Sequence, residues 1–133
     1  MTSSDQFSVS TGDRLTVVDV TDQVEQAIPD DVEQGLCAVF VRHTTAAIVI
    51  NEPEPRLLDD IEGFLSDLVP DEGHSHDELD GNADSHLRTT LLGPSETIPV
   101  VDGTPDTGTW QSVLLVECDG PRTRTVSVTV VGE

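Results

Sequence analysis

The sequence predicts an α+β fold: a single domain with a mainly antiparallel, sandwich-like β-sheet and two or three helices packed on it. Runs rich in β-branched residues outnumber helical ones, and clusters of turn residues separate them. One stretch, residues 54–68, has apolar residues at the three- and four-residue spacing of an amphipathic helix. With 133 residues the chain is long enough for one core and too short for two, so we expect residues 1–133 to form one domain.

Turn and cap residues set the limits of the expected elements. Thr21 can cap a short helix that Pro29 ends, and Gly93 ends the last helix. A polar loop, residues 71–80, separates the two longer helices. We expect the last two strands to form a hairpin, because turn residues 119–121 lie in the short segment between them. The strands are expected at residues 7–10, 14–20, 36–42, 46–51, 97–101, 109–117 and 124–131, and the helices at 21–28, 54–68 and 82–91.

The chain is strongly acidic. It has 26 Asp and Glu residues, six Arg and no Lys, which gives a formal net charge of −20. Such a chain repels nucleic acid and anionic membranes, because binding to phosphate-rich surfaces needs clustered positive charge. Disorder is disfavoured because 35% of the residues are hydrophobic and fall in periodic blocks. A carboxylate-covered surface without lysine indicates a halophilic source, where salt screens the repulsion between the negative charges.

The sequence has no targeting or membrane-spanning pattern. The N-terminal residues lack a basic region followed by an apolar segment, and no apolar run approaches about 18 residues. Both cysteines, Cys37 and Cys118, lie in apolar strand-like runs, where a free thiol behaves as a small hydrophobe. We therefore expect a cytoplasmic protein without a disulfide.

Three of the four histidines lie in one polar segment, GHSHDELDGNADSHLR, and are His74, His76 and His86. The fourth, His43, begins an HTT sequence at the junction of two predicted strands, where catalytic and ligand side chains usually lie. Neutral imidazole is a good zinc ligand, and a catalytic zinc site commonly has three protein ligands. If the polar segment folds back over the junction, His43, His76 and His86 can form such a site. The alternative for each histidine, and above all for His74, is a surface polar residue.

Other polar side chains can complete a site around these histidines. Carboxylates near the histidines can orient the imidazoles, and the candidates are Glu52, Asp77, Asp80 and Asp84. Retained arginines either bind a phosphate or carboxylate of a substrate or pair with the many acidic residues. The arginines concerned are Arg42, Arg88, Arg122 and Arg124, and four near one pocket favour an anionic small molecule.

The single tryptophan, Trp110, begins a predicted strand and is followed by Gln111. A core or interface anchor is the commoner role of such a residue. The alternative is that Trp110 stacks on a planar ring of a ligand while Gln111 hydrogen-bonds the edge of that ring.

Four sequences in this order, HTTAAIVINE, GHSHDELDGNADSHLRTTLLG, GTWQSVLLVE and DGPRTR, resemble the YjbQ family, also called the UPF0047 family of secondary thiamine-phosphate synthase enzymes. The resemblance extends from about residue 36 to the C-terminus. It implies a small α+β homotrimer with pockets near subunit boundaries and a metal site, with zinc as the metal, at His43, His76 and His86. Where this chain has His74 the family usually has tyrosine, which leaves open whether His74 replaces a hydroxyl, adds a ligand or has no role.

The family name implies that a hydroxymethylpyrimidine pyrophosphate is joined to a thiazole phosphate. Such an enzyme binds two phosphorylated heterocycles, stabilises the departing pyrophosphate and shields a pyrimidine cation from water. The alternatives are a trimeric protein that binds an anionic metabolite or metal without turnover, and a metal-dependent hydrolase of a phosphorylated small molecule. The catalytic candidates are His43, His76, His86 and Glu52, and the substrate-binding candidates are Asn82, Asp84, Arg88, Trp110, Gln111, Arg122 and Arg124.

Overall fold

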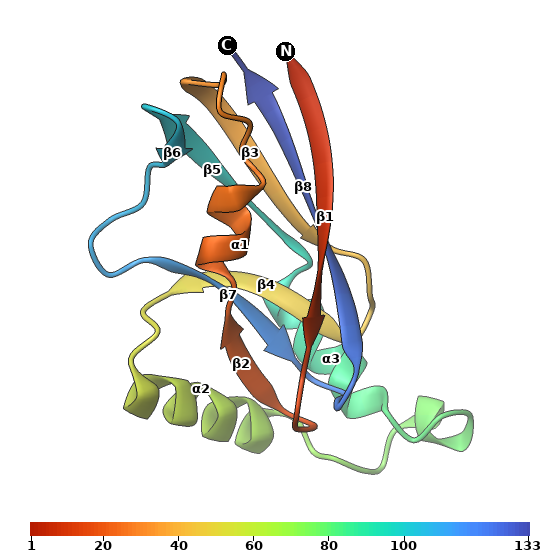
Figure 1. Ribbon diagram of the computed structural model, residues 1–133. Coiled ribbons are helices and arrows are strands. Elements are labelled where there is room, and N and C mark those ends of the chain that lie inside the picture. Colours follow the sequence, from red (N-terminus) through yellow and green to blue (C-terminus); the bar gives the residue numbers. More distant parts are fainter.

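The computed structural model describes residues 1–133 and contains two antiparallel sheets (Figure 1). The strands are β1 (Thr2–Ser10), β2 (Thr16–Asp19), β3 (Gln34–Val41), β4 (Ala46–Asn51), β5 (Ser95–Val101), β6 (Thr104–Pro105), β7 (Ser112–Glu117) and β8 (Thr123–Gly132). One sheet has five strands in the order β1-β8-β3-β5-β6, and the other has three in the order β2-β7-β4. With the helices described next, this arrangement confirms the predicted α+β class.

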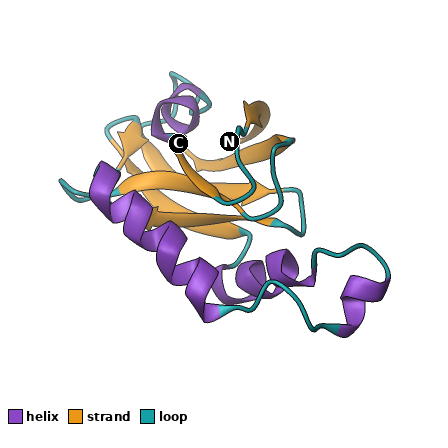
Figure 2. Ribbon diagram, turned by 90° about the horizontal axis from the view of Figure 1, so that it is seen from below, coloured by secondary structure: helices purple, strands orange, loops and turns teal.

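Three α-helices and one 3₁₀ helix complete the fold: α1 (Thr21–Gln26), α2 (Pro55–Leu68), α3 (Ala83–Leu92) and η1 (Ser75–Glu78). In Figure 1, α2 and α3 lie on the side of the three-stranded sheet that faces away from the five-stranded sheet. Figure 2 shows η1 at the end of a loop that projects beyond both helices. None of the helices is long and apolar enough to cross a membrane.

Helix α2 begins and ends close to the predicted limits. Pro55 occupies a position in the first turn, where its missing N–H is not needed. The Glu54 carboxylate accepts a hydrogen bond from the Leu57 N–H across 2.8 Å and so satisfies one of the free donors of that turn. The helix packs its apolar side, including the buried Leu65, against the three-stranded sheet.

The core has two layers that share the central strand β7. Val113 and Leu115 face the larger layer between the sheets, whereas Leu114 and Val116 face the smaller layer under α2 and α3. This alternation follows from the period of two along a strand, and because both faces are covered, the four central residues of β7 are all apolar. Cys37 and Cys118 are free, buried thiols, one in each layer.

The prediction that the last two strands form a hairpin is wrong. β7 has β2 on one edge and β4 on the other, so neither edge is left for β8, which pairs with β1 and β3. The first two predicted strands also lie in different sheets, and the short strand β6 and the helix η1 had no recognised pattern. Turn residues mark where a strand ends, but they do not show whether the chain stays in the same sheet.

Candidate functional site

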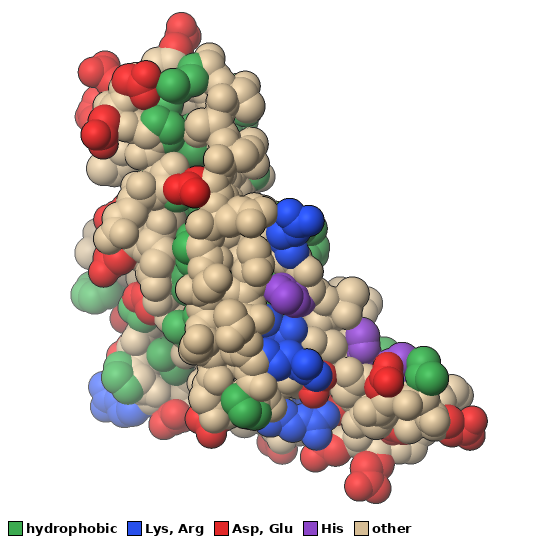
Figure 3. Space-filling model, turned by 45° about the vertical axis from the view of Figure 1, so that its right-hand side comes forward, with side chains coloured by type: hydrophobic (Ala, Val, Ile, Leu, Met, Phe, Trp, Pro, Cys, Tyr) green, Lys and Arg blue, Asp and Glu red, His purple; other side chains and the backbone are tan.

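Two adjoining cavities lie where β3 ends and α3 begins, and together they are called the cleft. Their volumes are about 640 and about 420 Å³. The larger cavity has an apolar wall that includes Phe40 and Pro94, whereas the smaller one is lined by polar residues only. Figure 3 shows arginine and histidine side chains gathered in the hollow between the body of the protein and its projecting lower part. The residues that line both cavities are Arg42, His43, Thr44 and His86.

A buried ion pair holds the His43-Thr44-Thr45 segment in place. Arg124 is 2% exposed, and its Nε donates to Glu117 Oε1 across 2.8 Å, with a second bond from Nη2 to Glu117 Oε2. The same Nη2 donates to Thr45 Oγ1 across 2.8 Å. A buried charge without partners is costly, so these contacts fix the position of Thr45 relative to β7 and β8. Arg124 borders the smaller cavity, but its bonds serve mainly to position the segment that carries His43.

Glu117 is the acceptor at the centre of this pair. Thr11 Oγ1 donates to Glu117 Oε1 across 2.7 Å, and the Asp119 N–H donates to Oε2 across 3.0 Å. Burial raises the pKa of the Glu117 carboxyl, but the bonds from Arg124, Asp119 and Thr11 outweigh that effect and hold the pKa below its usual value. The carboxyl is therefore ionised in the neutral pH range.

His43 faces the cleft and is anchored from behind. The backbone N–H of Thr125 on β8 donates to His43 Nε2 across 2.9 Å. Burial lowers the pKa of the imidazole, and the charges of Arg124, Arg122 and Arg42 lower it further, with partial opposition from Glu117. These effects favour a neutral imidazole in the cleft.

Arg42 is the one arginine without a carboxylate partner. The other five arginines form ion pairs: Arg14 and Arg88 with Asp84, Arg56 with Glu54, Arg122 with Asp119, and Arg124 with Glu117. Arg42 is exposed, makes no side-chain hydrogen bond and lines both cavities of the cleft. An unpaired guanidinium in a chain of net charge −20 leaves its donors free for an anion.

His76 and His86 lie against each other and line a third cavity of about 430 Å³. Their ring centroids are 4.8 Å apart with an interplanar angle of 86°. His76 Nε2 is buried and has no hydrogen-bond partner, and it lies 3.6 Å from Asp80 Oδ2. Since His86 also lines the cleft, the structure brings the predicted histidines into one region, with His86 between the other two.

The donor atoms fit a metal only in part. The buried, unpartnered Nε2 of His76 beside His86 suits a divalent cation. His43 does not complete the set, because its Nε2 already accepts the Thr125 N–H. Within one chain, no group of three or more His, Cys, Asp or Glu side chains is arranged to hold a metal ion.

His74 makes hydrogen bonds within the loop that carries η1. Its Nε2 lies 2.7 Å from the Pro70 carbonyl oxygen, and its backbone N–H donates to Asp77 Oδ2 across 3.2 Å. His74 is the residue before η1, and its carbonyl oxygen accepts the Asp77 N–H across 3.1 Å. The imidazole thus joins the start of η1 to the segment that follows α2, next to the stretch that holds His76.

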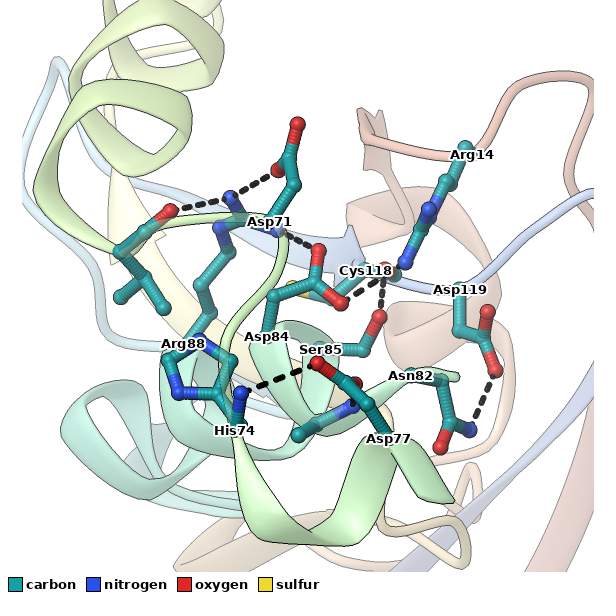
Figure 4. Close-up of polar contacts among 12 residues, drawn as sticks. Arg14, Asp71, His74, Asp77, Asn82, Asp84, Ser85, Arg88, Cys118 and Asp119 are labelled. Atoms are coloured by element: carbon teal, nitrogen blue, oxygen red, sulfur yellow. Dashed lines mark hydrogen bonds and ion pairs between the residues drawn. The ribbon is translucent and has the colours of Figure 1, made fainter. Parts of the chain in front are cut away.

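Asp84 and Arg88, both predicted to bind substrate, lie in a buried network instead of the cleft (Figure 4). Arg88 pairs with Asp84 and donates to the carbonyl oxygens of Leu65 and Val69, each across 2.8 Å. Arg14 reaches Asp84 from the other side across 2.8 Å. The network joins α3 to the end of α2, and its role is to hold the helix that carries His86.

Asn82 and Arg122, both predicted to bind substrate, line the smaller cavity. Asn82 is the residue before α3 but makes no capping bond through its side chain, and its Nδ2 donates to Asp119 Oδ2 across 2.9 Å. Arg122 donates to the same carboxylate oxygen across 3.1 Å. Asn82 Oδ1 is buried without a partner, so an acceptor remains available at this wall.

Glu52, Trp110 and Gln111 lie at the opposite end of the three-stranded sheet. Strand β4 pairs with β7 from Ala46 opposite Glu117, next to the cleft, to Asn51 opposite Ser112 at the far end. Glu52 follows Asn51, and Trp110 and Gln111 precede Ser112, so the sheet length separates all three from the cleft. Trp110 is 71% exposed, and Gln111 Oε1 accepts the Gly108 N–H across 2.8 Å.

Two threonines of α3, Thr89 and Thr90, were not predicted as site residues but line the larger cavity. Thr89 Oγ1 donates to the Thr44 carbonyl oxygen across 2.7 Å and so joins α3 to the segment that carries His43. They follow His86 by three and four residues, so they lie on the same side of the helix as His86. This spacing is the sequence signal from which they could have been predicted as site residues. The apolar wall has no such signal, because it depends on the pairing of β3 with β5.

The chain has close relatives over nearly its whole length. The family described as UPF0047 protein YjbQ-like matches residues 5–133. A UPF0047 protein of Methanothermobacter thermautotrophicus is 45% identical over 130 residues, which are 96% of this chain and 91% of that protein. A UPF0047 protein of Archaeoglobus fulgidus is 48% identical over 124 residues, which are 92% of this chain and 97% of that one.

Solved structures agree with these sequence matches. A YbjQ-like protein of unknown function from Sulfolobus solfataricus has a TM-score of 0.95 and 41% identity, covering 100% of this chain and 99% of its own. A hypothetical protein from Aeropyrum pernix has a TM-score of 0.95 and 46% identity, covering 98% of this chain and 99% of its own. Sequence and structure together show that the chain belongs to the UPF0047 family of YjbQ-like proteins.

Proposed function

We propose that this protein is an enzyme that binds a phosphorylated small molecule in the cleft. The observation that carries the proposal is the unpaired Arg42, because every other arginine of this acidic chain has a carboxylate partner. A phosphate next to Arg42 would also reach the guanidinium of Arg122 in the polar wall of the smaller cavity. The apolar wall at Phe40 and Pro94 offers a packing surface to a heterocyclic ring.

The reaction that we propose is the joining of a hydroxymethylpyrimidine pyrophosphate to a thiazole phosphate, which is the reaction implied by the chain's resemblance to thiamine-phosphate synthase enzymes. The cleft supplies positive charge for a departing pyrophosphate at Arg42 and Arg122, where preorganised donors stabilise developing charge. Its combined volume, from adjoining cavities of about 640 and about 420 Å³, suits two small heterocycles. A divalent cation, with zinc as the proposed ion, would be held by His76 and His86 and would help to neutralise phosphate charge.

We also propose that the protein is a homotrimer that uses the outer face of the five-stranded sheet. Leu36 and Val131 are paired there and are each 53% exposed, and Phe40 beside them is 43% exposed. An uncharged face is notable in a chain of net charge −20, because a second copy can cover it without burying charge. Phe40 also lines the cleft, so a second copy would border the site. The outward residues of β3 and β8 are Leu36, Ala38, Phe40, Ser127, Thr129 and Val131.

The direct test is to incubate the protein with both phosphorylated heterocycles and zinc at high salt and to measure thiamine phosphate. Product that forms with the wild type and is lost in Arg42→Ala supports the proposal. Arg56→Ala is the matched control, since Arg56 is exposed, pairs with Glu54 and lies outside the cleft. Substrate binding without product would indicate a binding protein, and release of phosphate alone would indicate a hydrolase, so either result would contradict the proposed reaction.

The proposed assembly has its own test. Analytical ultracentrifugation of the wild type is expected to give the mass of three chains. Phe40→Glu places a charge on the proposed contact face and is expected to give single chains. A wild type that sediments as one chain at all concentrations would contradict the trimer.

A further inference from the structure

We propose that His43 acts in the cleft as a neutral hydrogen-bond donor through Nδ1, and that it is neither a metal ligand nor a general base. The inference rests on the proposed function, because it names a group that meets the phosphate oxygens beside Arg42. It is carried by the hydrogen bonds at the end of the β3–β8 pairing.

The imidazole of His43 takes the place of a backbone acceptor. The pairing of β3 with β8 ends at Val41 opposite Val126, and one residue further the Arg42 N–H donates to the Thr125 carbonyl oxygen across 3.1 Å. In a regular antiparallel pair, the Thr125 N–H would donate back to the Arg42 carbonyl oxygen. It donates instead to His43 Nε2, across 2.9 Å.

This contact fixes which ring nitrogen carries the proton. A backbone N–H can only donate, so Nε2 must present its lone pair to Thr125, and the proton of the neutral ring is on Nδ1. Histidines that bind metals usually show the opposite arrangement, in which the nitrogen away from the metal donates its N–H to an acceptor. A metal on Nδ1 of neutral His43 would place the proton of Nε2 against the Thr125 N–H, and a metal on Nε2 would displace that N–H.

The Nδ1–H group is free to meet a ligand. It has no hydrogen-bond partner within the chain, and His43 lines both cavities of the cleft beside the unpaired Arg42. An anion that reaches the Arg42 guanidinium therefore has a second, neutral donor next to it. Because no lone pair of His43 faces the cleft, this residue binds and orients the anion but does not accept a proton from a substrate.

The tautomer can be measured in the wild-type protein by NMR of ¹⁵N-labelled histidine side chains. Spectra are recorded for the protein alone, with pyrophosphate and with zinc chloride. We expect a protonated Nδ1 and an unprotonated Nε2 for His43 in all three samples, with a shift of the Nδ1 proton when pyrophosphate is added. A protonated Nε2, or loss of the Nδ1 proton when zinc is added, would overturn the proposal.

Two amide variants separate the roles of the two ring nitrogens. Asn in His43→Asn can place its amide donor near the position of Nδ1, whereas Gln in His43→Gln reaches the position of Nε2 and accepts the Thr125 N–H. By calorimetry, we expect His43→Gln to bind pyrophosphate about tenfold more weakly than the wild type, and His43→Asn to bind it more tightly than His43→Gln. Equal affinity of His43→Gln and the wild type would overturn the donor role.

Failure of the proposed function gives a different pattern. If the wild type binds no pyrophosphate while the NMR spectra show the expected tautomer, anion binding fails and with it the donor role, although the assignment of the proton stands. If the wild type binds pyrophosphate but zinc affinity falls as much in His43→Gln as in His86→Ala, the proposed function survives and the inference about His43 is overturned.

Discussion

Arg124 and Glu117 form a buried ion pair that holds the segment carrying His43 in place. Glu117 is fully buried and Arg124 is 2% exposed, and the same guanidinium also holds Thr45 in the segment that begins with His43. Residues of β7 and β8, which lie in different sheets, are joined by this pair. The position of His43 in the cleft therefore depends on a buried ion pair between β7 and β8.

The lowered pKa of Glu117 predicts a loss of stability in acid. A carboxyl with a folded-state pKa below its unfolded value adds stability above the unfolded pKa, about 4.3 for Glu, and this is lost as the pH falls through the folded pKa. Chemical denaturation between about pH 6 and about pH 3 should show a smaller loss for Glu117→Gln, which has no proton to gain there. The same pH dependence in the variant and the wild type would contradict this role of Glu117.

Asp84 is predicted to be a structural residue of α3. Asp84→Asn removes the buried carboxylate that pairs with Arg88 and leaves the exposed Asp71 as its remaining charge partner, so we expect the free energy of unfolding to fall by about 3 kcal/mol in urea denaturation. Asp59→Asn, on the exposed side of α2, is the control and should change it by less than about 0.5 kcal/mol. A stable Asp84→Asn protein that has lost only ligand affinity would instead support a substrate-binding role.

The net charge of −20 predicts a protein that salt stabilises. Raising the salt concentration from about 0.1 M to about 1 M shortens the Debye length from about 10 Å to about 3 Å and so weakens repulsion between surface carboxylates. We expect the melting temperature, measured by circular dichroism, to rise over this range. A melting temperature that is constant or falls would argue against the proposed halophilic source.

His76 and His86 are predicted to hold a divalent cation. Loss of a residue that only supports a metal ligand typically weakens metal binding by about 10- to 100-fold. Removing the imidazole of His76 or of His86 removes a ligand itself, so we expect zinc affinity to fall by more than that. Zinc titrations of His76→Ala and His86→Ala are compared with that of the wild type. Arg56→Ala serves as a control, since Arg56 pairs with Glu54 and lines none of the three cavities. Unchanged zinc affinity in both histidine variants would contradict the site.

Local patterns predicted the elements of the fold but not how they pair. The strand at residues 46–51 and the helix at 54–68 agree with β4 and α2, because alternation, apolar spacing and proline limits are local properties. The chain changes sheet between β7 and β8 because β2 and β4 occupy both edges of β7. The residues of the turn carry no information about which strands occupy those edges.

The site was predicted as far as residue type and chain position allow. His43 and His86 do share a cleft, since a strand junction and a nearby helix carry them. Arg88 was placed in that cleft because its charge suggested a ligand, but a charge alone does not show whether its partner is a substrate or a buried Asp84. The Thr125 contact with His43 is a product of strand register, which the sequence does not show.

The central claim is that the free guanidinium of Arg42 binds a phosphorylated ligand, and pyrophosphate calorimetry tests it most directly. Wild type and Arg56→Ala should bind pyrophosphate equally, whereas Arg42→Ala should bind it about tenfold more weakly or worse, because a charged hydrogen-bond donor is lost. Equal affinities of Arg42→Ala and the wild type would contradict the account.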